Sequence, residues 1–304
     1  MTVMKFLVKL VMRLLSMLPL RVHYCLADIV SWLAEKVLRY RVHETTVNLA
    51  RSFPEKKYGE LKKIRHEFYR HFGEILAETV WFGGCRANGR LHASRLVEIT
   101  NPEELNRMYD CAPGVMVLMS HAGNWELIGG SLSYIYKDDA EFRATEQNFC
   151  VVYLRQSSRL WDSILRDNRR APLEDPENYP GYLEARNAVR YVYEHRHEKK
   201  IYNFITDQAP YFKAPDYMKV NFMHQDCTSM RGAAALAAKF GMAVCFMSMQ
   251  SAGRGHYKIK YVPISDDASL MTPEDIMKEY YRLLQADIEQ QPWNYLWTHR
   301  RWKY

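Results

Sequence analysis

The chain has 304 residues and a mass of 35.9 kDa, which is enough for one large domain or two small ones. Its composition, 48% hydrophobic and 25% charged, is typical of a folded globular protein and excludes a disordered or collagen-like chain. The six cysteines are scattered without a C-x-x-C pair, which argues against a zinc ribbon and against a secreted disulfide scaffold. We therefore expect a protein of a reducing compartment whose core folds without disulfides or metals.

The positive charge is concentrated at the N-terminus. Residues 1–41 carry seven Lys or Arg and two Asp or Glu, so they hold +5 of the total net charge of +7. The other 263 residues carry 35 positive and 33 negative side chains, a net charge of only +2. A nucleic-acid-binding protein usually spreads its basic residues over the folded domain. This distribution favours an anionic membrane surface as a partner and disfavours nucleic acid.

Residues 3–18 have the pattern of an amphipathic helix. Lys5, Lys9, Arg13 and Ser16 fall within an arc of about 80° on a helical wheel, and the rest of the wheel is apolar. No run reaches the roughly 18 uncharged residues of a spanning helix. The cations lie inside the apolar region and no A-x-A site follows, so a signal peptide is disfavoured. The alternative to membrane association is a core helix, in which the cations would need partners.

Pro19 ends this helix, and residues 24–38 predict a second amphipathic one. We expect 1–41 to form membrane-associating helices and 42–304 to form the catalytic domain. Helices are also expected over 59–80 and from the Asn101-Pro102-Glu103-Glu104 start signal.

Short apolar runs predict buried strands in the remainder of the chain. These runs cover 114–120, 149–154, 202–206, 243–249 and 257–264. Helical patterns separate several of them, the clearest being at 181–194, at 231–240 and from Thr272 to just before Pro292. Strands that alternate with helices indicate an α/β fold with a mostly parallel central sheet flanked by helices. The segment 165–182 is expected to be a long loop.

The segment LMSHAGNWELIGG, residues 118–130, has the pattern of an active-site turn. His121 directly follows a predicted buried strand, where the sites of α/β proteins gather, and Gly123 allows a tight turn. Glu126 lies five residues further on, so a turn followed by a helix can bring its carboxylate back to the imidazole. Such a pair orients a general base, and the first N–H groups of the helix could polarise a carbonyl. The alternative is a capping His beside a solvent-facing Glu.

Other reaction classes lose support. Gly129-Gly130-Ser131-Leu132-Ser133 lacks the closing Gly of a nucleophile elbow, and no phosphate-binding glycine motif is present. His66/His71 and His195/His197 do not match H-E-x-x-H. A base without a protein nucleophile indicates direct transfer, in which His121 deprotonates a hydroxyl that attacks a thioester.

Four motifs in order resemble the bacterial lipid A biosynthesis (late) acyltransferases of the lauroyl/myristoyl type, within the glycerolipid acyltransferase superfamily. H-A-G-N-W-E matches their H-x₄-[D/E] motif. Asn48-Leu49 with Ser52-Phe53-Pro54-Glu55 is similar to their N-L-x-x-S-F-P-E segment, and Asp207-Gln208 to a D-Q or D-H segment after a central strand. The ending 295–303 is similar to the closing Y-x-W-x-H-R-R-[FW]-K.

The resemblance implies a role for individual residues. His121 would be the base and Glu126 its orienting acid, and substrate binding is assigned to four residues: Asn124, Arg155, Asp207 and Gln208. For Asp207 and Gln208, bracing of the site is the other role considered. Arg155 lies near the family's strand-end Tyr-Arg element, but Leu154 separates it from Tyr153 and the usual Pro and Asn are missing. A surface ion pair for Arg155 and a loop cap for Asp207 are the alternatives.

The resemblance also implies the reaction and its setting. The expected donor is an acyl carrier protein and the expected acceptor a hydroxyl of a phosphorylated lipid A precursor, with no metal or organic cofactor. The expected location is the cytoplasmic face of the bacterial inner membrane. Two alternatives remain: an acyltransferase for another lipid, such as an aminoacyl lipid or lyso-lipid, and a non-catalytic membrane-surface lipid-binding protein.

Overall fold

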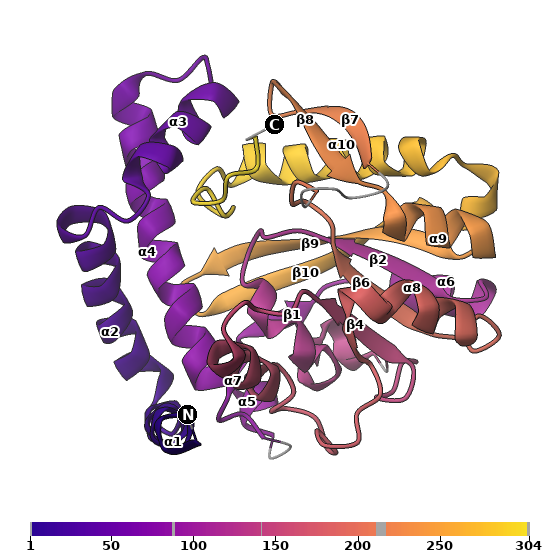
Figure 1. The fold of residues 1–304 in the computed structure, drawn as a ribbon, viewed down its shortest axis with the longest axis horizontal. Coiled ribbons are helices and arrows are strands. Elements are labelled where there is room, and N and C mark those ends of the chain that lie inside the picture. Colours follow the sequence, from indigo (N-terminus) through magenta and orange to yellow (C-terminus); the bar gives the residue numbers. More distant parts are fainter. Residues whose placement is uncertain (1, 87–88, 141, 211–216, 303–304) are drawn as a thin grey trace.

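The computed structural model describes residues 2–86, 89–140, 142–210 and 217–302, arranged as shown in Figure 1. Lys303 and the side chain of Lys5 lie outside this described part. The helices are α1 (Thr2–Ser16), α2 (Leu20–Trp32), the π-helix η1 (Leu33–Val37), α3 (Val42–Ser52), α4 (Tyr58–Phe82), α5 (Arg90–Ser94), α6 (Pro102–Cys111), the 3₁₀-helices η2 (Trp125–Ser133) and η3 (Lys137–Asp139), α7 (Arg159–Arg169), α8 (Ala185–Glu194), α9 (Gly232–Phe240), the 3₁₀-helix η4 (Ala268–Leu270) and α10 (Pro273–Gln290).

The strands form a large central sheet and a separate hairpin. They are β1 (Val97–Ile99), β2 (Val115–Met119), β3 (Ile135–Tyr136), β4 (Phe149–Tyr153), β5 (Tyr182–Glu184), β6 (Ile201–Ile205), β7 (Tyr217–Phe222), β8 (Gln225–Met230), β9 (Ala243–Gly253) and β10 (His256–Ser265). The eight-stranded sheet has the order β3-β1-β10-β9-β2-β6-β4-β5. Its neighbours pair in parallel except β9 and β10, which form an antiparallel hairpin. The predicted α/β fold with a mostly parallel sheet is confirmed.

The sheet is buried on both faces, which explains why its central strands are unbroken apolar runs. All five residues of β2 are buried. Met116 and Leu118 belong to the core shared with α8, α9 and α10, whereas Val115, Val117 and Met119 belong to the core on the other face, with α6 and the end of α4. This alternation is the period of two expected of a strand.

Helix α2 runs alongside α4, and α1 contacts α4 near one end and crosses it (Figure 1). Many large apolar side chains of this N-terminal segment are between 36% and 73% exposed: Phe6, Leu7, Leu10, Val11, Leu14, Met17, Val22, Leu26, Ile29, Val30, Trp32, Leu33, Val37 and Leu38. Lys9 forms an ion pair with Asp167 of α7, and Arg13 is exposed. Within the described ranges, no helix combines the length and the apolar character needed to cross a bilayer. The two predicted helices are present, and their membrane association stays a prediction, as does a domain boundary at residue 41.

Three local expectations differ from the structure. The segment 165–182 is not all loop, because α7 runs to Arg169. The helix was missed because the sequence of α7 is rich in Arg and Asp and its outer face is strongly polar. The predicted helix 181–194 begins with strand β5 and becomes helical at Ala185. Asn101 does not cap α6 with its side chain, since its amide instead bonds the backbone N–H and C=O of Tyr261 in β10.

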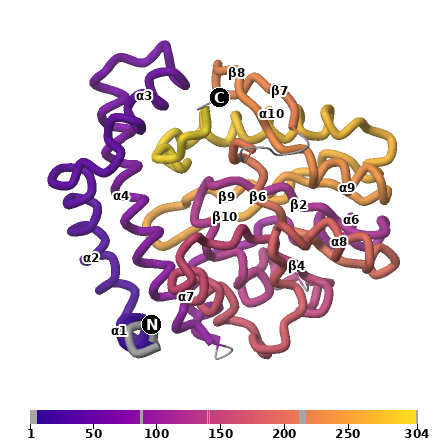
Figure 2. The backbone as a smooth tube through the Cα atoms, viewed as in Figure 1, coloured from indigo at the N-terminus to yellow at the C-terminus, as the bar shows by residue number. Residues whose placement is uncertain are grey.

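The C-terminal segment after α10 returns across the molecule and lies between α3 and the β7–β8 hairpin (Figure 2). The amide of Asn48 in α3 donates to the carbonyls of Trp297 (2.9 Å) and His299 (3.0 Å). The guanidinium of Arg301, which is 1% exposed, donates to the carbonyl of Thr228 in β8. The segment from Trp297 to Arg301 is therefore part of the fold, held by hydrogen bonds to segments distant in sequence.

Candidate active site

The site lies where β2 and β6 end. These neighbouring strands pair in parallel with Met119 opposite Ile205. His121 lies two residues after Met119, and Asp207 lies two residues after Ile205. The register therefore places both at the same edge of the sheet. The carboxyl edge of a parallel sheet is where α/β proteins place their ligands.

The imidazole of His121 is held from both sides. Its Nδ1 lies 2.7 Å from Oδ1 of Asp207, and its backbone N–H donates to Oδ2 of the same carboxylate at 3.1 Å. Because a carboxylate only accepts hydrogen bonds, Nδ1 carries the proton and Nε2 presents a lone pair. The amide nitrogen of Gln208 lies 2.9 Å from Nε2 and donates to it. Nε2 is thus the nitrogen able to take a proton from a substrate.

Asp207 is 1% exposed, so its charge needs compensation. Burial by itself would raise the pKa of this carboxyl, but the neighbouring His121 and the hydrogen bonds from it outweigh burial and hold the pKa below its ordinary value. Asp207 is therefore an ionised carboxylate aimed at Nδ1. This arrangement orients the imidazole and stabilises its protonated form.

The structure does not bring Glu126 to His121. Both carboxylate oxygens of Glu126 accept from the guanidinium of Arg169 in α7, each at 2.7 Å, and Oε1 also accepts from the Trp125 indole at 3.1 Å. The expected contact fails for a geometric reason. The chain enters η2 directly at Trp125, and the next side chain points towards α7. The geometry therefore assigns the orienting carboxylate to Asp207, while a contribution of Glu126 to catalysis stays a prediction.

Asn124 is fully buried, and both ends of its amide are occupied within the protein. The oxygen accepts from the backbone N–H of Glu126 and caps η2, while the nitrogen donates to Glu78 of α4 at 2.8 Å. The N–H of Leu127 bonds the Asn124 carbonyl. These first N–H groups of η2 are engaged locally and do not face a substrate carbonyl. Binding of substrate by Asn124 stays a prediction.

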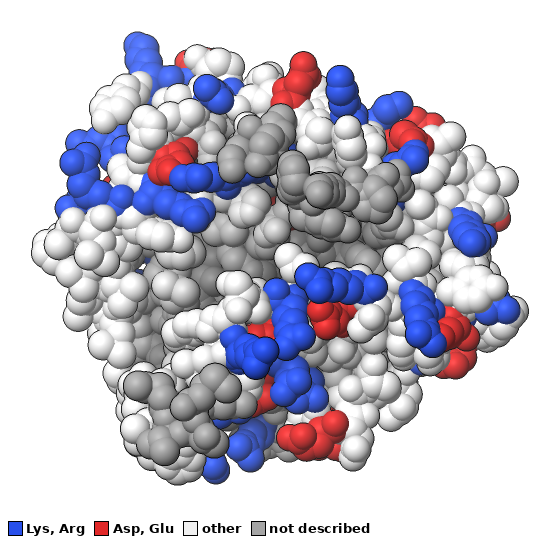
Figure 3. All heavy atoms as spheres, viewed as in Figure 1, with Lys and Arg blue, Asp and Glu red and all other residues white. Residues whose placement is uncertain are grey.

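Arg155 lies in the segment that follows β4, the strand next to β6 in the sheet. Its side chain is 57% exposed, and its Nε lies 3.9 Å from Oδ2 of Asp162 in α7. Figure 3 shows Lys and Arg gathered with Asp and Glu in the middle of one face, over the part of the molecule where α7 lies in Figure 1. The contact with Asp162 is the surface ion pair that was the alternative for Arg155, and a role in phosphate binding stays a prediction.

The C-terminal segment closes the turn that carries His121. Leu296 donates its N–H to the carbonyl of His121, Tyr295 bridges to Ala122, and the carbonyl and side chain of Asn294 both accept from Gly123. Gly123 has φ +66°, and a Cβ on it would meet Met249 at 2.6–3.0 Å. Only glycine fits this turn without strain.

Two aromatic rings contact the imidazole. The Trp125 ring meets His121 edge-on with centroids 4.9 Å apart, and His299 stacks on it at 6.3 Å with 8° between the planes. Burial lowers the pKa of His299, which therefore stacks as a neutral ring. Sequence reasoning did not identify His299 or Arg169 as site residues. His299 lies within the closing motif, whereas no local sequence pattern indicated Arg169.

A narrow depression without room for a water molecule lies beside the imidazole, and Phe68, His71 and Ile75 of α4 are among the residues that line it. Across the described ranges, no three His, Cys, Asp or Glu side chains are grouped so that they could hold a metal ion. The functional groups offered at this edge are a base nitrogen, its carboxylate, a primary amide and two flanking rings. Together they can accept a proton from a hydroxyl.

An imidazole oriented by a carboxylate, at the carboxyl edge of a parallel sheet, is a geometry suited to general-base catalysis of group transfer. Comparison with known families gives the more specific result. A family profile described as bacterial lipid A biosynthesis acyltransferase matches residues 1–304. The chain belongs to this family, which is an acyltransferase family of lipid A biosynthesis. A comparison with curated proteins finds no match.

The Glu126–Arg169 pair generates a stability prediction. Both side chains are less than 15% exposed, so removing one leaves the other as a buried, unpaired charge. Glu126→Ala and Arg169→Ala should each lower the free energy of unfolding by about 3–5 kcal/mol, measured by urea denaturation. The double variant should lose clearly less than the sum. Strictly additive losses would show that the pair contributes no coupling energy.

Proposed function

We propose that this protein transfers a fatty acyl chain from an acyl thioester, carried by an acyl carrier protein, to a hydroxyl of a phosphorylated lipid A precursor. Family membership supports acyl transfer in lipid A biosynthesis. The observation that carries the mechanism is the 2.7 Å contact between His121 Nδ1 and Asp207. It leaves Nε2 as the base, and no serine or cysteine nucleophile is required.

In the proposed reaction, the acceptor hydroxyl takes the place of the Gln208 amide at Nε2 and gives its proton to that nitrogen. The oxygen forms a bond to the thioester carbonyl carbon, and a tetrahedral oxyanion results. Collapse of this intermediate breaks the carbon–sulfur bond, and the imidazolium returns the proton to the departing thiolate. The products are an ester and a free thiol, so the proton and the electron pairs balance. Asp207 stabilises the imidazolium while it exists.

The exposed apolar side chains of α1 and α2 support a membrane surface as the place of reaction. The acceptor is itself a lipid, so a protein that lies on a bilayer meets it without extracting it. Burying apolar side chains such as Leu10 and Leu14 in the bilayer interface gives binding that high salt does not remove, and the excess of cations over 1–41 adds preference for anionic lipids. Within a bacterial cell, we place this surface at the cytoplasmic face of the inner membrane.

The first prediction concerns the base and its partner. His121→Ala should lower kcat by about 10²–10⁴-fold. Asp207→Asn should act similarly, because its amide would donate to Nδ1, move the proton to Nε2 and remove the base. The double variant should be little worse than either single one. The measurement is transfer of a labelled acyl chain from carrier protein to lipid A precursor in mixed vesicles, with circular dichroism to confirm folding.

The same assay distinguishes the two candidate carboxylates. If Glu126 were the orienting acid, Glu126→Gln would match His121→Ala and Asp207→Asn would be mild. Mass spectrometry of lipid A from a strain that lacks the protein tests the function as a whole. We expect a species lighter by one acyl chain, and an unchanged lipid A profile would contradict the proposed acceptor.

The second prediction concerns the acceptor phosphate. If Arg155 binds it, Arg155→Ala should raise KM for the acceptor at least fivefold more than KM for the donor. Lys should rescue only in part, because it lacks the planar fork that binds two phosphate oxygens. Arg190→Ala is the matched control, since this side chain is 83% exposed and pairs with Glu194. Equal effects on donor and acceptor would give Arg155 a structural role.

The third prediction concerns the membrane. Leu10→Ser with Leu14→Ser should weaken binding to anionic vesicles by about tenfold or more, since each buried leucine contributes about 1.5–3 kcal/mol when fully transferred from water. Val189→Ser with Leu270→Ser is the control, because these residues are 58% and 83% exposed outside the N-terminal helices. Vesicle flotation at low and high salt measures the effect. Equal flotation of both double variants would contradict membrane binding through α1.

A further inference from the structure

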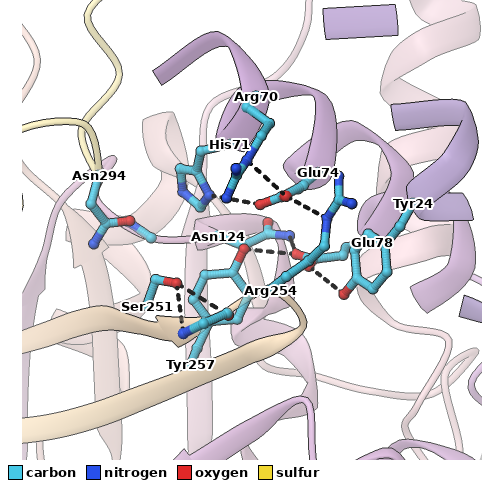
Figure 4. Close-up of polar contacts among 12 residues, drawn as sticks. Tyr24, Arg70, His71, Glu74, Glu78, Asn124, Ser251, Arg254, Tyr257 and Asn294 are labelled. Atoms are coloured by element: carbon cyan, nitrogen blue, oxygen red, sulfur yellow. Dashed lines mark hydrogen bonds and ion pairs between the residues drawn. The ribbon is translucent and has the colours of Figure 1, made fainter. Parts of the chain in front are cut away.

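A fully buried carboxylate joins the N-terminal helices to the active-site turn. Glu78 of α4 is 0% exposed, and its carboxylate accepts three hydrogen bonds. The donors are the hydroxyl of Tyr24 in α2 (2.8 Å), the amide of Asn124 (2.8 Å) and the hydroxyl of Tyr257 in β10 (2.9 Å). Figure 4 shows these side chains converging on one point from three separate segments.

This network is costly unless it is complete. Its three donors are neutral, so no opposite charge among them compensates the carboxylate. Burial raises the pKa of Glu78 above its ordinary value, although the hydrogen bonds act in the opposite direction. A buried acceptor that loses a donor bears much of its desolvation cost. A change in the position of one donor therefore affects the hydrogen bonds that the carboxylate accepts from the other two.

Asn124 connects this network to the start of η2. Its amide nitrogen is bound by Glu78, and its amide oxygen caps η2 through the N–H of Glu126 at 3.2 Å. One rigid planar group thus connects the carboxylate to the turn that starts at His121. A shift of Glu78 must move this cap or break it.

The other end of the network lies in a helix whose far side is apolar. Tyr24 approaches Gly255 so closely that a Cβ there would lie 2.6 Å from the hydroxyl, and Arg254 lies over its ring at 5.1 Å. Arg254 also bonds Glu74 of α4 at 2.6 Å and pairs with Asp28 of α2. The outward side chains of α2, including Ile29 and Trp32, are 56% and 57% exposed. Contact with a lipid surface would act on α2 from that side.

We propose that Glu78 is a positioning residue for acyl transfer, through which the docking of α2 on α4 sets the geometry of the turn from His121 to Asn124. The kinetic part of this inference rests on the proposed function. Its physical part, a coupling between α2 and the turn, does not. Seating of α2 at a lipid surface then favours the arrangement in which the cap of η2 and the base are aligned.

The test compares two tyrosines that tie α4 to the N-terminal segment. Tyr24→Phe removes one donor from Glu78 and keeps the ring. Tyr69→Phe is the matched control, because its hydroxyl bonds the carbonyl of Tyr40 and has no link to Asn124. Both variants are made in the whole chain and are compared with the wild-type protein and with Glu78→Gln.

Hydrogen exchange of the amides of Glu126 and Leu127 reports on the cap without any substrate. We expect Tyr24→Phe to accelerate their exchange by about tenfold and Tyr69→Phe to leave it within twofold. In the Glu78→Gln background, Tyr24→Phe should add nothing further. If the two tyrosine variants respond equally, or neither responds, the coupling is overturned, whether or not Glu78→Gln folds.

Kinetics on vesicles separate positioning from simple destabilisation. Tyr24→Phe should lower kcat about 5–50-fold with KM for the donor within twofold, and Tyr69→Phe should leave both within twofold. A wild-type kcat in Tyr24→Phe overturns the kinetic part. If wild type itself transfers no acyl chain while Tyr24→Phe still accelerates exchange, the proposed function fails and the coupling stands.

Discussion

The hydrogen bonds between the parallel strands β2 and β6 fix where His121 and Asp207 lie at the edge of the sheet. Met119 and Ile205 are register partners, so the two strands end at the same level of the sheet. The register alone therefore places the backbones of His121 and Asp207 side by side. The Asp207 carboxylate then binds both the backbone N–H and Nδ1 of His121, which fixes the ring's position and its tautomer together. A slip of one residue between these strands would send one of the two groups to the opposite face of the sheet.

The sequence motifs that are far apart along the chain meet around this edge. Asn48, from the first motif, binds carbonyls of the closing motif, and the closing motif in turn binds the carbonyl of His121 through Leu296. Asp207 supplies the remaining contact. These hydrogen bonds hold the motifs together in space: α3 binds the C-terminal segment, and that segment binds the turn.

The fold class and the edge carrying the site could be predicted because central parallel strands are buried on both faces and appear as unbroken apolar runs. The partner of His121 could not. Glu126 is close in sequence, whereas Asp207 is 86 residues away and becomes a neighbour only through the strand order β2-β6. The β7–β8 hairpin escaped prediction because its exposed residues break the apolar pattern. Glu78 lies in a helix rich in charged residues, where periodicity does not reveal which carboxylate is buried.

Three buried or nearly buried carboxylates surround the turn, and each is compensated differently. The charge of Glu126 is compensated by the guanidinium of Arg169, which is always protonated. Glu78 faces only neutral donors, so its state depends on the segments that supply them. Asp207 faces an imidazole that is neutral until it has taken a proton. In the proposed reaction, the attraction between Asp207 and His121 would increase as the proton arrives. It would then stabilise the transition state more than the ground state, which is the requirement for accelerating the chemical step.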